Sequence, residues 1–231
     1  IGDTIASGNI ATGTGTLTKS GAGNLTLSGN NTYTGATTIS AGMIQIGHAS
    51  ALGVGGNITF GGGGLQYGST ITTDISSRLK NSASAILIDT NSNNVTFANS
   101  VDSTNSGGLT KNGTGTLTLT NANTYSGGTT INVGTLNVTN SSALGSGNVS
   151  VAAGGKLEVG ANNLTIANNI TLNGATTNGA IYSNQPGAGV TTNLTGQITL
   201  NATSNVSNVW NDKTLQLSGK ITGVGGLDFV L

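Results

Sequence analysis

Apolar and polar residues alternate along this chain in short stretches, each with two apolar side chains separated by one polar residue. Such a stretch places both apolar side chains on one face of a β-strand and the polar one on the other. No long segment has the apolar spacing of an amphipathic helix. Because strands this short are not stable alone, they must pack on one another. We expect them at residues 25–27, 44–46, 58–60, 65–67, 117–119, 136–138, 149–151 and 157–159.

The spacing of these strands predicts the architecture. Leu25, Ile44 and Leu65 lie about 20 residues apart, and the later series at 117, 136 and 157 keeps the same interval. A strand that recurs at a fixed phase is typical of a solenoid. A β-sandwich would need tight hairpins, whereas the Asn-Gly pairs here flank irregular sequence or fall within a repeat corner. We therefore predict a coil in which each strand stacks on its equivalent one turn later.

A longer repeat is superimposed on the coil. Residues 17–60 match residues 109–151, with roughly half of the positions identical over about 40 residues. A third copy is expected to start near Gly223, where 223–227 parallels 105–109. We therefore interpret residues 1–231 as one segment of a longer solenoid.

Both copies share one motif, in which glycines, an Asn-Thr-Tyr triplet and paired apolar residues recur in the same order. The motif strongly resembles the autotransporter passenger-associated strand repeat. This resemblance implies a right-handed parallel β-helix, secreted through the outer membrane by a C-terminal β-barrel that lies outside these residues, and a location at the bacterial surface or beyond it. The matching positions are Gly21, Gly23, Leu25, Leu27, Asn31, Thr32, Tyr33, Gly35, Thr37, Ile39, Gly42, Ile44 and Ile46, and then Gly113, Gly115, Leu117, Leu119, Asn123, Thr124, Tyr125, Gly127, Thr129, Ile131, Gly134, Leu136 and Val138.

The physical chemistry of these residues suits a coil. Glycine reaches positive φ without steric cost, which the sharp corners require. Leu119 and Ile131 are predicted to point into the core, and Thr118 outward. Tyr33 and Tyr125 precede a glycine by two residues in each copy. We interpret them as caps over a corner of the core rather than as ligand-stacking residues.

Charge and composition exclude several classes of partner. Charged residues make up 6% of the chain and its formal net charge is zero, so no electrostatic footprint for nucleic acid is present. Aromatic residues make up 3%, too few for a base- or sugar-stacking platform. No apolar run approaches the ~18 residues of a membrane-spanning helix. The N-terminus at Ile1 lacks the basic and apolar regions of a signal peptide.

No catalytic, cofactor-binding or metal-binding residues are predicted, and the chain is not expected to be an enzyme. The tightest group of acids is Asp74, Asp89 and Asp102, which successive coils could bring together near Arg78 and Lys80. Glycoside hydrolysis needs two carboxyls about 5–10 Å apart. Solvated loop charges with local pairing are the favoured interpretation of this trio. His48 is the single histidine, and its counterpart in the second copy is Asn140, which indicates an interchangeable loop position.

Three functions remain open. The first is a structural stalk or scaffold that aids export by folding progressively. The second is an adhesive surface that binds host, matrix or neighbouring cells, or a second copy of itself. The third, more remote, is an ice- or sugar-crystal-binding face, which needs Thr-x-Thr at one phase in each coil. Runs at 12–18 and 114–120 supply such threonines, but the coils at 44–46, 65–67 and 157–159 lack them.

Overall fold

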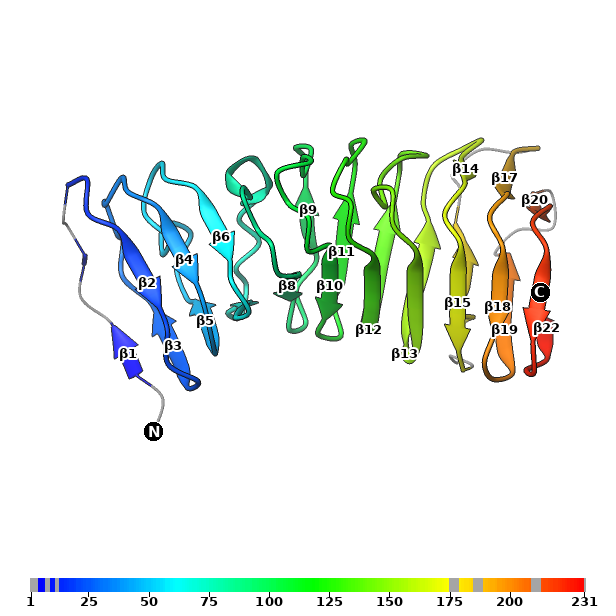
Figure 1. Ribbon diagram of the computed structural model, residues 1–231, viewed down its shortest axis with the longest axis horizontal. Helices are drawn as coiled ribbons and strands as arrows, with labels where there is room; N and C mark the ends of the chain where they lie inside the picture. The colour runs from blue at the N-terminus through cyan, green and yellow to red at the C-terminus, as the bar shows by residue number, and fades with distance from the viewer. Residues whose placement is uncertain are drawn as a thin grey trace.

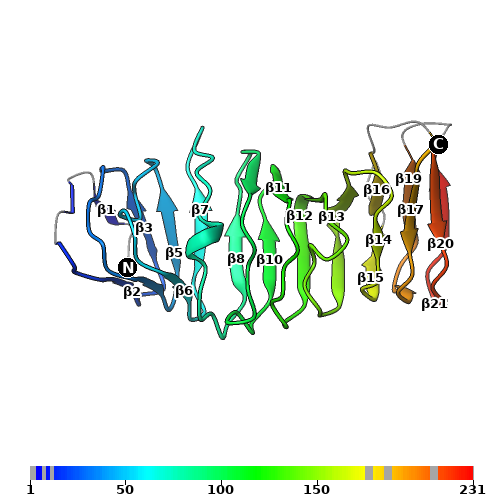
Figure 2. The same cartoon turned by 90° about the horizontal axis from the view of Figure 1, so that it is seen from above.

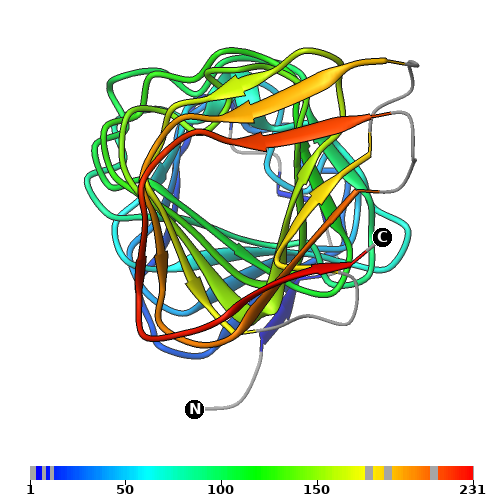
Figure 3. The ribbon, with the colours of Figure 1, turned by 90° about the vertical axis from the view of Figure 1, so that its right-hand side faces the viewer.

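The chain folds into one elongated solenoid of stacked coils (Figures 1 and 2). The computed structural model describes residues 4–6, 9–10, 13–174, 179–184, 189–208 and 213–230. Within these residues the one helical element is a short 3-10 turn, η1 (Ser76–Arg78). Seen along the axis with the C-terminal coil nearest the viewer, the chain runs counter-clockwise as it approaches (Figure 3). The coil is therefore right-handed. The prediction of an all-β, right-handed parallel β-helix is confirmed.

Each coil contributes to three faces, which we number 1 to 3, and the strand pairs that build them are parallel. Face 1 is an eleven-strand path through the largest sheet. It comprises β1 (Thr4–Ala6), β3 (Asn24–Leu27), β5 (Met43–Ile46), β7 (Gly64–Tyr67), β8 (Ile86–Asp89), β10 (Leu109–Asn112), the first parts of β12 (Thr129–Val138) and β13 (Val149–Val159), β15 (Ile170–Asn173), β18 (Ile198–Leu200) and β21 (Ile221–Gly223).

The other two faces are less continuous. Face 2 comprises β9 (Val95–Phe97), β11 (Thr116–Leu119), the second parts of β12 and β13, β16 (Ile181–Ser183), β19 (Ser204–Asn208) and β22 (Leu227–Val230). Face 3 holds two three-stranded sheets, formed by β2 (Leu17–Lys19), β4 (Thr37–Ile39) and β6 (Ile58–Phe60), and by β14 (Thr165–Ile166), β17 (Thr191–Leu194) and β20 (Thr214–Leu217).

The register confirms the predicted coil length. Leu117 pairs with Leu136 and Leu136 with Leu157, so these coils span 19 and 21 residues (117 to 136, then 136 to 157). Coils outside the repeats are longer: Ile170 pairs with Ile198, 28 residues on. Strand β8 pairs with both β7 and β10 and so joins the two repeats in one ladder. The same ladder places Ile221 at the phase of Leu109, through 129, 149, 170 and 198.

Inward side chains form a single continuous core along the axis. Leu117, Leu136 and Leu157 stack on one another and are each 0% exposed. Leu119 and Ile131 are buried, whereas Thr118 between two inward leucines stays partly exposed. The predicted inward and outward phase of this strand is therefore confirmed. Burying each such aliphatic side chain stabilises the fold by about 1.5–3 kcal/mol.

A glycine with positive φ stands at the same corner in both repeats. Gly42 has φ of 65° and Gly134 has φ of 72°. A Cβ on either would lie 2.3 Å from a carbonyl oxygen of the preceding coil, that of Gly23 or Gly113. Only glycine fits this close approach of two successive corners, which explains why both copies keep it.

Candidate functional site

The structure places the three candidate carboxylates in separate local roles. Asp74 accepts hydrogen bonds from the backbone N–H of Ser76 at 2.8 Å and of Ala98 at 3.0 Å. Asp74 therefore satisfies backbone of its own loop and of the next coil. No group of three His, Cys, Asp or Glu side chains that could hold a metal ion occurs in the part of the chain that the structure describes.

The other two acids follow the same pattern. Asp89 accepts from the backbone N–H of Asn91 at 2.7 Å and from the Gln66 amide at 2.8 Å. Asp102 forms an ion pair with Lys80. Hydrogen bonds from Lys80 and then from Thr104 hold the pKa of Asp102 below its usual range. The trio is thus engaged as loop caps with local pairing, as the favoured interpretation expected.

His48 and Asn140 perform the same task in the two repeats. His48 Nδ1 accepts the backbone N–H of Ser50 at 3.0 Å, and Asn140 Oδ1 accepts that of Ser142 at 2.9 Å. Both side chains close a turn onto the residue two positions on. The predicted interchangeable loop position is confirmed at the level of this hydrogen bond.

The two tyrosines are buried at a corner of the core, as predicted. Tyr33 is 1% exposed and Tyr125 is 0% exposed. Their hydroxyls share a hydrogen bond with Thr37 Oγ1 at 2.8 Å and with Thr129 Oγ1 at 2.7 Å. Burial raises the pKa of both phenols. Neither ring is available to stack a ligand.

Sequence reasoning missed the role of the asparagine in the Asn-Thr-Tyr triplet. Asn123 Oδ1 accepts the backbone N–H of Val101 at 2.7 Å, and its Nδ2 donates to the carbonyl of Ala143 at 2.6 Å. Asn31 makes the same pair of bonds, to Ile10 at 2.8 Å and Ala51 at 2.6 Å. Each buried asparagine therefore bridges the coil before it and the coil after it. The recurrence of this asparagine at the same position in both motifs was the signal in the sequence that pointed to a structural role.

The inward direction of Lys19 and Lys111 was also missed. Lys111 is 0% exposed, and its Nζ donates to the carbonyls of Asn112 at 2.9 Å, Gly113 at 2.8 Å and Val133 at 3.2 Å. Lys19 bonds in the same way to Gly21 and Ala41. Loss of water contacts lowers the pKa of Lys111 to about 8. Lysines are seldom buried without an acid, so the composition does not indicate that these two side chains point inward.

Two rows of polar side chains run along the outside of face 1. The amide row holds Gln45, Gln66, Asp89, Asn112, Asn132, Asn173 and Asn201, and Ala152 interrupts it between Asn132 and Asn173. The hydroxyl row beside it holds Thr110, Thr130, Ser150, Thr171, Thr199 and Thr222. On face 2 the outward position after Thr118 is taken by Asn137, Glu158 and Tyr182. No Thr-x-Thr pair therefore recurs in every described coil.

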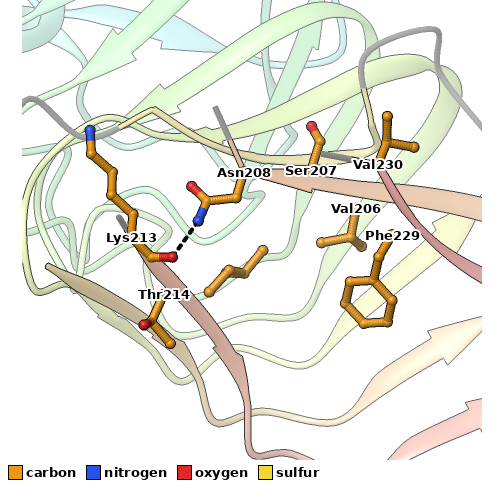
Figure 4. Close-up of a pocket in the computed structure, with 8 residues that line it drawn as sticks. Val206, Ser207, Asn208, Lys213, Thr214, Phe229 and Val230 are labelled. Atoms are coloured by element: carbon orange, nitrogen blue, oxygen red, sulfur yellow. Dashed lines mark hydrogen bonds between the residues drawn. The ribbon is translucent and has the colours of Figure 1, made fainter. Parts of the chain in front are cut away.

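A cavity of about 240 Å³ lies between β19, β20 and β22 (Figure 4). Val206, Leu215 and Phe229 supply its apolar wall, and Phe229 is 66% exposed. Across it, the Asn208 amide donates to the carbonyl of Lys213 at 2.8 Å. Lys213 is the one titratable side chain among its eight lining residues, so the cavity offers no acid–base pair.

Within the described residues, no helix is long and apolar enough to cross a membrane. This finding agrees with the strand architecture.

Comparison with known proteins identifies the repeats. Residues 17–46 and 109–138 match the passenger-associated-transport-repeat family. The chain is also 33% identical, over 250 aligned residues, to the adhesin BmaC autotransporter of Brucella suis biovar 1 (strain 1330). The alignment covers 95% of this chain but 7% of that protein. No solved structure matches the chain.

Proposed function

We propose that this chain, a β-helical autotransporter passenger segment with two passenger-associated transport repeats, is a non-enzymatic scaffold that aids its own export by folding coil by coil. Its place is the bacterial surface or the extracellular space. In the full-length protein its partner is a C-terminal outer-membrane β-barrel. The scaffold holds other modules away from the cell.

The buried bridges between coils carry this proposal. Asn123 is satisfied only when the coils of Val101 and Ala143 are both in place. Lys111 needs the carbonyl of Val133 from the following coil. A buried polar group without its partner costs about 1–3 kcal/mol. Each repeat is therefore completed by its neighbours, and stacking one coil favours the next, as in one-dimensional solenoids.

A surface-display experiment tests the export role. The chain is fused to an outer-membrane autotransporter barrel, and the fraction reached by external protease is measured for the wild type and for Asn123→Ala. The matched control is Asn148→Ala, because Asn148 is exposed. We expect Asn123→Ala to lower the displayed fraction several-fold and Asn148→Ala to leave it unchanged. Wild-type display of an Asn123→Ala chain that unfolds more easily in solution would contradict the proposal.

Adhesion is the second candidate, favoured by the printed name of the BmaC relative and by the long uncharged strip on face 1. The contacts would be with host, matrix, neighbouring cells or a second copy. Beads coated with the chain should then adhere to cells or matrix above the level of beads coated with an unrelated β-solenoid. An ice-binding face stays the remote third candidate, because the threonines of face 1 form a single row.

A further inference from the structure

Each repeat contains the same corner, which follows the sequence Ser-Ala-Leu-Gly. The N–H of Gly53 donates to the carbonyl of Ser50 in the first repeat, and the N–H of Gly145 donates to that of Ser142 in the second. Both glycines have positive φ, 65° and 62°. In both repeats the residue after the glycine then donates to the carbonyl of the buried tyrosine. The two corners therefore share one backbone arrangement, and they differ in the side chains that cover them.

An arginine from the next coil covers the first corner. Arg78 Nε donates to the carbonyl of Gly56 at 2.7 Å. Its Nη1 and Nη2 donate to the carbonyls of Gly53 at 3.1 Å and Leu52 at 2.7 Å. The planar guanidinium carries its donors in a fixed fork, so it meets three converging carbonyls at once. The first corner is thus a receptor for a guanidinium group.

A shorter side chain covers the second corner. Asn168 Nδ2 donates to the carbonyls of Gly145 at 3.1 Å and Gly147 at 2.8 Å. These two glycines are the counterparts of Gly53 and Gly56. The match follows because the residue after Gly56 and the residue after Gly147 each accept the N–H of the threonine that bonds the buried tyrosine. The amide therefore replaces two of the three contacts that the guanidinium makes in the first repeat.

The shorter side chain has a cavity beside it, of about 180 Å³. This volume is below the roughly 300 Å³ at which small-molecule sites begin, so the cavity suits one side chain rather than a whole ligand. The carbonyl of Gly145 accepts one bond from Asn168, and a carbonyl oxygen can accept two. Serine hydroxyls supply further acceptors. The lining residues are Ser141, Ser142, Gly145, Ser146, Ala167 and Asn168.

We propose that this cavity binds the arginine side chain of a partner protein, with its guanidinium against the second corner as Arg78 lies against the first. The partner is a different protein, because Arg78 is the only arginine of this chain and its guanidinium is already engaged. The three serines of the wall are exposed, so a side chain can enter from outside. This role goes beyond the scaffold function and does not depend on it.

Titration of the full chain with N-acetylarginine amide, followed by NMR, tests the proposal. We expect saturable shifts of the Asn168 side-chain amide and of the Gly145 N–H, with a Kd of about 1–10 mM, since the lining carries no charge. N-acetyllysine amide should bind at least about fivefold more weakly, because an ammonium has no planar fork. The N–H of Gly53 should not shift, because Arg78 covers its corner.

Two variants exchange the side chains of the two corners. Asn168→Arg supplies a guanidinium from within the chain and should weaken binding of the arginine probe at Gly145 by at least about tenfold. The matched control Thr96→Arg adds the same charge at an exposed position on face 2 and should bind like the wild type. Arg78→Asn gives the first corner the side chain of the second, and should produce a new set of saturable shifts at Gly53.

Three results would overturn the proposal. The first is a wild type without saturable shifts at Gly145. The second is undiminished binding at Gly145 in Asn168→Arg, with the spectrum of that variant showing a folded chain. The third is equal affinity for the lysine and arginine probes, which would make the cavity a site for cations in general. If Arg78→Asn does not fold, the wild type and Asn168→Arg still decide. None of these results bears on the display experiment, which uses the buried Asn123.

Discussion

Ile44 of the first repeat and Ile131 of the second lie in one ladder, although aligning the two repeats pairs Ile44 with Leu136. The ladder runs from Ile44 through residues 65, 88 and 111 to Ile131. The second repeat is therefore rotated about the axis by one face relative to the first. The cause is the spacing of the repeats, because equivalent residues lie 92 positions apart (25 to 117) whereas the four ladder coils through β8 take 86 (25 to 111). Equivalent residues of the two copies thus point to different sides of the solenoid.

The buried lysine gives the fold an unusual pH dependence. The pKa of Lys111 is about 8 in the folded chain and 10.5 as a free side chain. Between these values the unfolded chain binds more protons than the folded one, so the free energy of unfolding should rise with pH. We expect a rise from pH 8 to pH 9.5, measured by urea unfolding.

The control for this prediction is Lys111→Met, which removes the titrating group and should flatten the rise. The range stops at pH 9.5 because the raised pKa values of the buried tyrosines favour unfolding above their ordinary value of 10.0. An unchanged slope in Lys111→Met would mean that another group titrates in this range.

Leu119 and Thr118 test the energetics of the inward and outward positions. Leu119→Asp places an unpaired charge among stacked aliphatic side chains and should cost several kcal/mol. Thr118→Asp lies on the outer face and should cost less than about 1 kcal/mol. Chemical denaturation of both variants gives the comparison. Equal losses would contradict the 1% exposure of Leu119.

The bridging Asn123 should contribute more to the free energy of unfolding than an exposed asparagine does. Asn123→Ala leaves the N–H of Val101 and the carbonyl of Ala143 buried without partners, at a cost of about 2–4 kcal/mol. Amide hydrogen exchange should show the loss of protection in three successive coils. The exposed Asn148→Ala variant should change the unfolding free energy by less than about 0.5 kcal/mol. Loss of protection confined to one coil would refute the bridging role.

His48 can be replaced by the residue that the second repeat uses. His48→Asn keeps an acceptor for the N–H of Ser50 and should leave the melting temperature unchanged. His48→Ala removes the acceptor from this turn and should cost about 0.5–1 kcal/mol. Greater damage from asparagine than from alanine would show that the imidazole has a role of its own.

The carboxylate trio should have no catalytic effect. Because Asp74, Asp89 and Asp102 each cap local backbone, the chain should not cleave glycans. Incubation with a panel of polysaccharides and analysis of reducing ends checks this. Turnover that disappears in Asp74→Ala, Asp89→Ala or Asp102→Ala would show that these loops form a catalytic site.

The sequence predicts much of this fold because β-strands and corners have local signatures. The triplet 117–119 and the glycine at 134 each determine their own conformation, and the near-constant spacing stacks them. The hydroxyl row could not be predicted, because its alignment depends on the lengths of all the coils between Thr110 and Thr222. The burial of Lys111 could not be predicted, because no local pattern in the sequence indicates that three backbone carbonyls lie around its Nζ. The rotation between repeats needs the pairing of β8, which is a long-range property.

The asparagine bridges reach one coil in each direction and no further. A gene segment that encodes whole coils can therefore be duplicated or lost, and the new junction offers every bridge the neighbours it needs. Loss of one residue inside a strand is different, because it turns the inward side chains of that strand outward, whereas the corners accommodate coils of 19 to 28 residues. Changes in chain length by unequal recombination should therefore be tolerated when they add or remove whole coils or alter corners, and not when they fall within a strand. A chain built in this way can therefore change its length coil by coil while the pattern within each strand is preserved.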